Sequence, residues 1–535
     1  MKLPTSAEGP EKKDYWVALV FAIVALIAYV RTLAPDVLYG DSAEFQTLSY
    51  TLGVTHSTGY PTYLFLARVI GFLPIRNPAW RISLFSALCA AITVGGVYLL
   101  ARYFTYSRVG AVLGGLALGL SYTFWSQAII AEVYTPGMAF LVAIMLLLFH
   151  WQTEPGQRSL SLFAAALVAG IGFGVHASVW LVAPPAIALV LWTLWWNRAS
   201  RSDWLRALFA GSIGAVIGLT IFVMAFLITD WLNPPTSFIR TTLKPSRVFW
   251  DLQPADFDSP LNHLKMTVFS VQWADALFPQ DENFAFSNEL EDFNARLTTH
   301  EFSSVVLLFA VVGAVVMIVT QPIRGAFYLL TFLVSLFIIL NYRAWEKYVF
   351  YLSLYIPLAV SVGTGMGFVL DRVYRYLQPN SERGYPWRYL VVSSCFIAIV
   401  LQPKAFVRWQ AIQKGTPNFI SADYPFPAEN LNEPRLVAQS RLASMEDNAV
   451  FVLDFQTLYS TAYVAHVEQG LTNMLFFEAM PYGNDGKIAS TLATELEGYL
   501  QAGRSVFIDQ NYPGLEQKFH VLPSAGNVYK LLLRE

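Results

Sequence analysis

Positions 208–228 read LFAGSIGAVIGLTIFVMAFLI, a stretch without a charged side chain. An α-helix rises about 1.5 Å per residue, so a stretch of this length crosses the roughly 30 Å hydrocarbon layer of a membrane. A charged side chain is costly in that layer, and an uncharged run is therefore typical of a transmembrane helix. We predict that these residues span a membrane.

Comparable apolar runs recur along the chain, which has 535 residues, 55% of them hydrophobic and 13% charged. Soluble domains carry about 25% charged residues, so this composition indicates an integral membrane protein. We predict about eleven spans on the criterion of bilayer thickness. They cover residues 15–33, 82–104, 109–125, 133–151, 160–175, 179–195, 208–228, 303–320, 326–340, 349–370 and 389–401.

The sequence also argues against several functional classes. The net charge is −2 and the arginines are scattered between apolar runs, which disfavours nucleic acid as a partner. No Gly-rich phosphate loop precedes a Lys-Ser or Lys-Thr pair, so an ATP-driven pump is disfavoured. The two cysteines, Cys89 and Cys395, fall inside apolar runs and are predicted to be packing residues.

The distribution of Lys and Arg among the short loops sets the expected orientation. Short cytoplasmic loops are enriched in these cations, and the enrichment falls on one set of alternate loops if residues 1–14 form a cytoplasmic tail. Residues 15–401 then form the transmembrane domain. Two long loops, 34–81 and 230–302, and a C-terminal domain, 402–535, lie on the outer side.

The C-terminal segment has the pattern of a small α/β domain. Runs of β-forming residues at 449–455, 505–509 and 528–533 alternate with helix-like stretches at 457–469 and 489–501. The predicted fold is therefore an α-helical polytopic membrane protein with a compact extracytoplasmic α/β domain.

The loop 34–81 carries the most informative polar residues. Asp41 and Glu44 stand three positions apart, so on a helix that begins near Ser42 they face one place. Such a pair suits general acid–base chemistry. The alternative is a capping box, in which Asp41 caps the helix and Glu44 bonds back to the cap backbone. The two interpretations are compatible.

His56 follows in the same loop, and Gly59-Tyr60-Pro61 predicts a turn. The apolar run 61–74 is too short to span a bilayer, so we expect an interfacial or re-entrant helix there. Tyr60 is a candidate ligand residue, although an aromatic residue of the interfacial belt is the alternative.

Further polar residues fall at the predicted outer ends of later spans. A carboxylate at a membrane boundary is costly, so we expect Glu132 to have a partner or to face a water-filled cavity. The alternative is that its side chain snorkels toward the interface. Gln127 and Tyr134 flank Glu132. His176 follows a Gly-rich stretch that permits close helix packing. A histidine that hydrogen-bonds within the helix bundle is as good an interpretation as one that binds a ligand.

The short loop between the spans at 326–340 and 349–370 contains Arg343, Glu346 and Lys347. Cations in an outer loop run against the inside-positive trend, which favours an anionic partner such as a phosphate. A surface cluster of ion pairs among the three residues is the alternative.

The order of these motifs resembles a known family. Asp41-Ser-Ala-Glu44, His56-x-x-Gly-Tyr-Pro61, Gln127 followed by Glu132-Val-Tyr134, and the Gly-rich helix before His176 look like the bacterial membrane proteins related to the animal transmembrane O-mannosyltransferase. These are GT-C class glycosyltransferases. Ala43 stands where the family usually has Gly, and Ser57 and Thr58 stand where it usually has two prolines, which puts substrate choice in doubt.

The resemblance implies an inverting enzyme of a bacterial plasma membrane. It would move a sugar, with mannose as a candidate, from a polyprenyl-phosphate carrier to an extracytoplasmic hydroxyl of a protein or glycan acceptor. No cofactor is required. Whether a divalent cation binds Asp41, Glu44 and Glu132 stays open. The implied catalytic residues are Asp41 as base and Glu44 as helper, and the implied substrate-binding residues are His56, Tyr60, Gln127, Glu132, Tyr134, His176, Arg343 and Lys347.

Two other functional classes compete with this interpretation. A transporter or lipid flippase would place the same charges along a path near the membrane midplane, whereas here the acids stand at span ends and in loops. A scaffold that binds a partner through its C-terminal domain would leave the outward clustering of polar residues unexplained.

Overall fold

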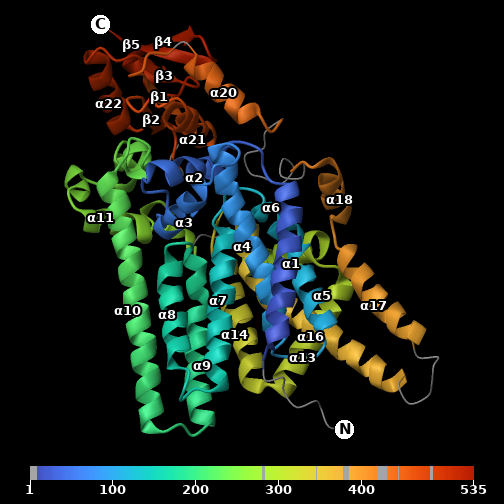
Figure 1. Ribbon diagram of the computed structural model, residues 1–535. Helices are drawn as coiled ribbons and strands as arrows, with labels where there is room; N and C mark the ends of the chain where they lie inside the picture. The colour runs from blue at the N-terminus through green and yellow to red at the C-terminus, as the bar shows by residue number, and fades with distance from the viewer. Residues whose placement is uncertain are drawn as a thin grey trace.

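The computed structural model describes residues 9–279, 284–344, 346–377, 385–417, 430–443, 445–481 and 486–534. A bundle of helices carries a small α/β domain at one end, and α1 (Lys12–Arg31) begins toward the opposite end (Figure 1). The predicted class of a polytopic helical membrane protein with a C-terminal sheet is confirmed.

Among the described residues, seven helices are long and apolar enough to cross a bilayer, or up to ten segments if each of three bent pairs is one span. The seven are α1 (Lys12–Arg31), α4 (Pro78–Ala101), α7 (Tyr134–Thr153), Ala177–Trp196, which joins η1 (Ala177–Val182) and α9 (Ala183–Trp196), α10 (Arg201–Leu232), α14 (Pro322–Leu340) and α16 (Leu352–Leu377).

The three bent pairs explain why periodicity alone does not fix the number of spans. They join α5 (Arg108–Gly119) to α6 (Tyr122–Ala128) at 70°, Phe286–Glu301 to α13 (Ser304–Thr320) at 111°, and part of α17 (Tyr385–Val400) to α18 (Ala405–Lys414) at 81°. The second pair begins with α12 (Phe286–Arg296) and η6 (Leu297–Glu301). Helix α8 (Ser159–Phe173) is apolar but shorter than the others. Each of the predicted spans thus contains helix, with fewer straight crossings than the eleven predicted.

Close helix contacts in the bundle depend on small residues. A Cβ added at Gly313 of α13 would lie 1.8 Å from the carbonyl oxygen of Ser361 on α16, and one at Gly214 of α10 would lie 2.3 Å from the carbonyl oxygen of Phe163 on α8. Backbones this close require glycine, as is usual where transmembrane helices pack through van der Waals contact.

Two short helices lie between the bundle and the C-terminal domain (Figure 1). They are α2 (Gly40–Thr51) and α3 (Pro61–Gly71). Pro61 is the first residue of α3, where its missing N–H and fixed φ are well tolerated. At 11 residues, α3 is too short to cross a bilayer.

The segment around residues 230–268 forms short helical pieces beside the same end of the bundle. They are η2 (Ile239–Leu243), η3 (Arg247–Trp250), η4 (Pro254–Phe257) and α11 (Pro260–Val268). Helices η5 (Val271–Ala276) and α15 (Lys347–Phe350) complete the connections between the longer helices.

The C-terminal domain is built on a five-stranded sheet in the order β2-β1-β3-β5-β4. Strand β1 (Val450–Leu453) pairs in parallel with β2 (Leu475–Glu478) and β3 (Val506–Ile508), and β5 (Val528–Leu533) runs antiparallel to β3 and to β4 (Phe519–Ser524). The remaining elements are α20 (Glu433–Leu442), α21 (Phe455–Ala462), η9 (Tyr463–Glu468), α22 (Ser490–Gln501) and η10 (Leu515–Gln517).

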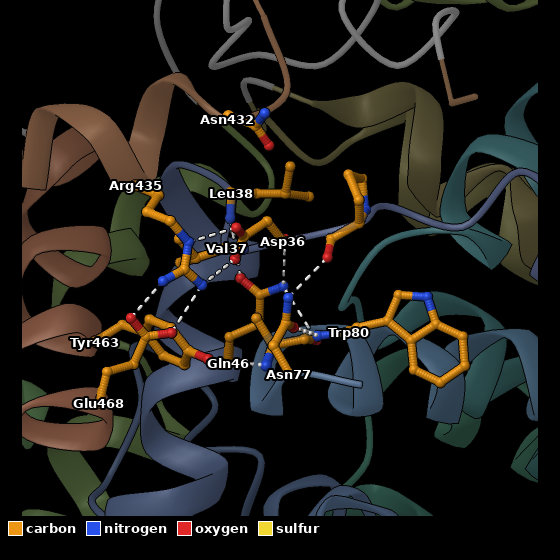
Figure 2. Close-up of polar contacts among 12 residues, drawn as sticks. Asp36, Val37, Leu38, Gln46, Asn77, Trp80, Asn432, Arg435, Tyr463 and Glu468 are labelled. Atoms are coloured by element: carbon orange, nitrogen blue, oxygen red, sulfur yellow. Dashed lines mark hydrogen bonds and ion pairs between the residues drawn. The ribbon is translucent and has the colours of Figure 1, made fainter. Parts of the chain in front are cut away.

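An ion-pair cluster ties this domain to the segment that precedes α2. The Arg435 guanidinium of α20 binds both carboxylate oxygens of Asp36 and also pairs with Glu468 of η9 (Figure 2). Beside it, the Gln46 side chain of α2 accepts a bond from the Leu38 amide at 3.0 Å. Since the hydrogen bonds join three segments far apart in sequence, they fix how the domain sits on the bundle.

Candidate active site

Helix α2 begins at Gly40, whose φ of 57° lies in the left-handed region that glycine tolerates best. Tyr39 is the N-cap residue and provides no side-chain cap bond. The predicted capping role of Asp41 is therefore wrong, because the helix starts at Gly40, two residues earlier than the predicted start near Ser42. Asp41 instead lies inside the first turn, and its carboxylate does not cap the helix.

Glu44 is fully buried and is held by His56. The main-chain amide of His56 donates to Glu44 Oε1 at 2.9 Å, and His56 Nδ1 bonds Glu44 Oε2. The capping-box alternative for Glu44 is thus wrong as well, since both carboxylate oxygens face the loop and not the cap. Burial acts to lower the pKa of His56, but the charges of Glu44 and Asp41 outweigh it and raise that pKa to about 9. His56 is a cation at neutral pH.

Asp41 differs from Glu44 in having no partner of this kind. Among the described residues no side chain or amide donates a hydrogen bond to its carboxylate. Burial raises the pKa of Asp41, the His56 charge opposes this, and the Glu44 charge adds to it. A carboxylate that is unbonded and unusually basic is what a general base requires.

Asp41, Glu44 and His56 offer ligand atoms that all lie within 4.8 Å of one another, close enough to surround a metal ion. Glu44 and His56 satisfy each other instead, because the His56 ring and its amide already occupy both oxygens of Glu44. Glu132, the third carboxylate considered for a cation, bonds the Ser42 hydroxyl. We derive no metal-dependent step from this cluster.

Glu132 is buried between α6 and α7. Its Oε1 accepts a bond from the Ser42 hydroxyl at 3.4 Å, and its main chain exchanges two bonds with the Ser86 hydroxyl of α4 at 3.0 and 3.1 Å. Burial, with the charges of Asp41 and Glu346, raises the pKa of Glu132 well above its ordinary value. A protonated carboxylic acid can donate a hydrogen bond to a substrate oxygen.

Aromatic rings form one wall of the site. Tyr60 has a φ of 38° at the turn before α3, and its ring stacks on the His176 imidazole at 6.0 Å with an angle of 3° between the planes. Tyr134 contacts the same imidazole at 5.1 Å, and Phe350 does so at 5.6 Å. The predicted residues Tyr60, Tyr134 and His176 therefore meet, although they come from three separate segments.

His176 is a neutral hydrogen-bond donor. Ser178 donates its amide to His176 Nδ1 at 3.2 Å, and its hydroxyl lies 2.6 Å from the same atom. Since Nδ1 accepts, the ring proton resides on Nε2. Burial, with the positive charge of His56, lowers the pKa of His176 to about 4, so the ring is uncharged near neutrality.

The loop at 341–347 contains residues that bond to other segments and one residue that Asp41 influences. Lys347 pairs with Glu289 of α12. The main-chain amide of Arg343 donates to the Ala276 carbonyl at 2.7 Å, and its side chain is exposed.

Glu346 belongs to the site, which sequence reasoning missed. Burial and the neighbouring charge of Asp41 raise its pKa to about 8. Its place in a mixed-charge loop suggested a surface residue, and no local signal in the sequence distinguishes it from Arg343 and Lys347.

Gln127 lies on α6 with a buried side chain. Its Oε1 has no hydrogen-bond partner within the part of the chain that the structure describes. A buried amide oxygen without a partner costs free energy, so Gln127 is suited to bind a ligand hydroxyl.

The C-terminal domain also reaches the site. The Phe455 ring lies 6.4 Å from the His56 ring, and the buried Tyr459 hydroxyl lies 3.3 Å from the Thr241 hydroxyl. Burial, above all, raises the pKa of Glu478 to about 7, and Glu44 and His56 also act on it. Nothing in the local sequence near these residues indicates that they approach α2.

Part of the chain is similar to a family of known proteins. Residues 41–200 match the family model described as the protein O-mannosyl-transferase TMEM260 N-terminal domain. The TMEM260 protein of Mus musculus is 29% identical over 147 residues, which are 27% of this chain and 21% of that protein. The protein of Dictyostelium discoideum is 29% identical over 141 residues, 26% of this chain and 17% of that protein. The match thus covers about a fifth of the relatives' length.

Solved structures with the same fold cover nearly the whole chain. ArnT from Cupriavidus metallidurans in the apo state has a TM-score of 0.57 at 13% identity and covers 96% of this chain and 97% of that one. AglB from Archaeoglobus fulgidus, in complex with an inhibitory peptide and a dolichol-phosphate, has a TM-score of 0.51 at 12% identity and covers 98% and 75%. The predicted resemblance and the GT-C fold are confirmed.

Proposed function

We propose that this protein transfers a sugar from a polyprenyl-phosphate carrier to a hydroxyl of an extracytoplasmic acceptor. One observation carries the proposal. The Asp41 carboxylate is unbonded within the described residues and unusually basic, and it stands beside Glu44, which His56 holds by two bonds. The region that contains these residues matches the O-mannosyltransferase family, so mannose is the first sugar to test.

In the proposed reaction, the acceptor hydroxyl attacks the anomeric carbon of the lipid-linked sugar. Asp41 takes the hydroxyl proton, a new C–O bond forms, and the bond to the phosphate oxygen breaks with its electron pair leaving on the phosphate. A single displacement enters opposite the leaving group and so inverts the anomeric centre. Glu44 and His56 keep Asp41 in a fixed electrostatic environment, which favours preorganised proton transfer.

The leaving phosphate needs hydrogen-bond donors in a site rich in carboxyl groups. His176 Nε2–H is one candidate donor, and protonated Glu132 and Glu346 are two others, since raised pKa values keep them neutral. Arg343 is exposed on the adjoining loop and is assigned to the phosphate as a cation. Lys347, which pairs with Glu289 of α12, is assigned to the phosphate as the second cation of this loop.

An apolar groove offers a place for the isoprenoid chain. The cavity has a volume of about 730 Å³ and is bounded by α7, α8, η1, α9 and α10, with Val179 in its lining and Arg201 and Trp204 also among the lining residues. Val179 stands near Gly137, which also faces the His176 side chain. The groove therefore adjoins the proposed site. A structure of the same fold, ArnT of Cupriavidus metallidurans, holds undecaprenyl phosphate, which supports a lipid-linked donor.

The test is a transfer assay with purified protein in lipid vesicles. Polyprenyl-phosphate mannose with a labelled sugar is supplied together with Ser- and Thr-containing peptides or a glycan acceptor. We expect label to appear on an acceptor, in the anomeric configuration opposite to that of the donor. Absence of transfer from every polyprenyl-phosphate sugar tested would overturn the proposal. Movement of intact lipid across the vesicle without transfer would favour the flippase alternative.

A further inference from the structure

A cavity of about 660 Å³ lies between the C-terminal end of α10 and the C-terminal domain, where β2 and α22 lie over that helix in Figure 1. The segment after α10 lines it with Asn233, Arg240 and Lys244, and the domain lines it with residues 475–477 of β2 and with Tyr499 of α22. None of the residues assigned above to catalysis or to the lipid donor is in this lining. The cavity is therefore a second candidate site.

Two cations in the cavity, Arg240 and Lys244, have exposed side chains and no carboxylate partner within the described part of the chain. Arg240 donates to the Asn233 carbonyl at 3.1 Å, which uses one of its five donors. The other two charged lining residues, Glu495 and His263, each pair with a residue outside the lining, at 3.3 and 2.7 Å. The cavity consequently presents a net positive charge, which favours an anionic ligand group.

Strand β2 presents an unpaired edge to the same space. It is the outermost strand of the sheet and pairs only with β1. The Leu475 and Ala479 amides donate to main-chain carbonyls on the β1 side, at 3.1 and 2.8 Å. The Phe476 and Glu478 amides alternate with them and so face the outer edge, where no main-chain group of another described segment bonds them. Such an edge can pair with an extended peptide.

The Asn233 side chain offers the cavity a hydrogen-bond acceptor. Its Oδ1 is buried and has no partner among the residues that the structure describes. A buried acceptor without a partner costs free energy, and a peptide N–H would satisfy it. A fully ionised phosphate or carboxylate has no proton to donate, so the lining suits an acidic peptide better than an isolated anion.

The carboxyl end of β2 lies beside the proposed active site. Glu478 ends the strand, accepts a bond from the Thr242 hydroxyl at 2.7 Å and stands opposite Leu453 of β1. Two residues after Leu453, the Phe455 ring meets the His56 ring at 6.4 Å. A chain that pairs with β2 and continues past its carboxyl end is thereby directed toward His56.

We propose that this cavity binds the acceptor as an extended polypeptide segment, which pairs with the outer edge of β2 and places an acidic side chain against Arg240 and Lys244. The proposal deepens the proposed function and rests on it for the role of the peptide as acceptor. It adds a sequence preference, because the acidic residue then stands a few positions from the modified Ser or Thr.

The charge requirement is tested with a double variant and a matched control. Arg240→Gln/Lys244→Gln removes both cavity cations, whereas Lys265→Gln/Arg534→Gln removes one exposed lysine and one exposed arginine outside the cavity. The probe is a fluorescein-labelled Ser/Thr peptide that contains Asp and Glu, and its anisotropy gives Kd for the full-length protein in phosphatidylcholine nanodiscs. We expect the cavity variant to bind about tenfold more weakly, as the loss of two exposed ion pairs allows, and the control to bind as wild type does. Equal Kd values for the two variants would overturn the proposal.

Changes in the peptide distinguish a paired polypeptide from other anionic ligands. Replacing its Asp and Glu by Asn and Gln should weaken binding to wild type about tenfold and leave binding to the cavity variant unchanged. N-methylation of one residue at a time should weaken binding at every second position, because only alternate amides of a paired strand face β2. Equal binding of all the methylated peptides would overturn the pairing. Binding of an acidic polysaccharide or of phosphatidylglycerol vesicles, without binding of the peptide, would overturn the choice of ligand.

The transfer assay separates this proposal from the proposed function. With the same peptide as acceptor, the cavity variant should raise KM for the peptide about tenfold and keep kcat and the KM for the lipid donor within about twofold of wild type. If wild type binds the peptide as described but transfers no sugar to it, the proposed function fails and the peptide site stands. If wild type transfers sugar and the cavity variant keeps the wild-type KM for the peptide, the peptide site alone is overturned.

Discussion

His56 binds Glu44 through both its main-chain amide, at 2.9 Å, and its imidazole Nδ1. The pair joins the first turns of α2 to the loop that follows the helix, so the conformation of that loop is coupled to the carboxylate. Since the second bond is charge-assisted, it depends on the protonation state of His56. The pair therefore links local stability to pH.

The pH dependence of stability follows from the His56 pKa, raised from its ordinary 6.5 to about 9. The folded protein holds this proton more tightly than the unfolded chain does. The stabilisation is complete below about pH 6.5, falls between pH 6.5 and 9, and is absent above. We expect the melting temperature of wild type to approach that of His56→Gln over this interval. Parallel curves for the two proteins would contradict the ion pair.

The clamp of Figure 2 predicts the effect of removing Arg435. Arg435→Ala leaves Asp36 and Glu468 facing each other without a cation, so the C-terminal domain should bind the bundle less firmly. We expect the melting temperature to fall by a few °C and limited proteolysis to release the domain sooner. Arg534→Ala, at an exposed arginine of the same domain, is the control. Equal proteolysis rates for both variants would show that the clamp is dispensable.

The sequence predicts the membrane class and the polar motifs of the site because both depend on local patterns. Apolar runs of bilayer length locate the helices. The order of the motifs that contain Asp41, His56 and Glu132 indicates the family. The bends between α5 and α6 and between η6 and α13 have no comparable signal. A helix-period pattern continues through a bend, so periodicity reports length and not direction.

The remaining site residues depend on tertiary contacts between distant segments. Glu346 lies in the same mixed-charge loop as Arg343 and Lys347, and nothing in the local sequence indicates that Asp41 raises its pKa. Tyr459 and Glu478 lie in a domain whose docking on α2 is fixed by side chains such as Arg435. Strands β2 and β4 have no counterpart among the β-forming runs predicted from the sequence.

Metal dependence is a separate prediction. The Glu44 carboxylate is fully engaged by His56, and the His56 Nδ1 that would coordinate a cation bonds Glu44 instead. We expect transfer to proceed at the wild-type rate after dialysis against EDTA. A loss of transfer that Mn²⁺ or Mg²⁺ restores would show that a cation displaces the His56 contact.

The proposed orientation can be measured with single cysteines. Asp258 and Ser202 are both exposed, on the predicted outer and cytoplasmic sides respectively, and the native Cys89 and Cys395 are buried. A membrane-impermeant maleimide applied to intact cells should label Asp258→Cys and spare Ser202→Cys. The reverse pattern would invert the topology and place the site in the cytoplasm.

The central claim is that Asp41 is the base in a sugar transfer, and Asp41→Asn tests it most directly. The substitution removes the proton acceptor while keeping nearly the same shape. With polyprenyl-phosphate sugar as donor, we predict that kcat falls by about 10²- to 10⁴-fold, while donor binding is retained and Asp258→Asn, at an exposed aspartate, transfers at the wild-type rate. Transfer by Asp41→Asn at the wild-type rate would contradict the account.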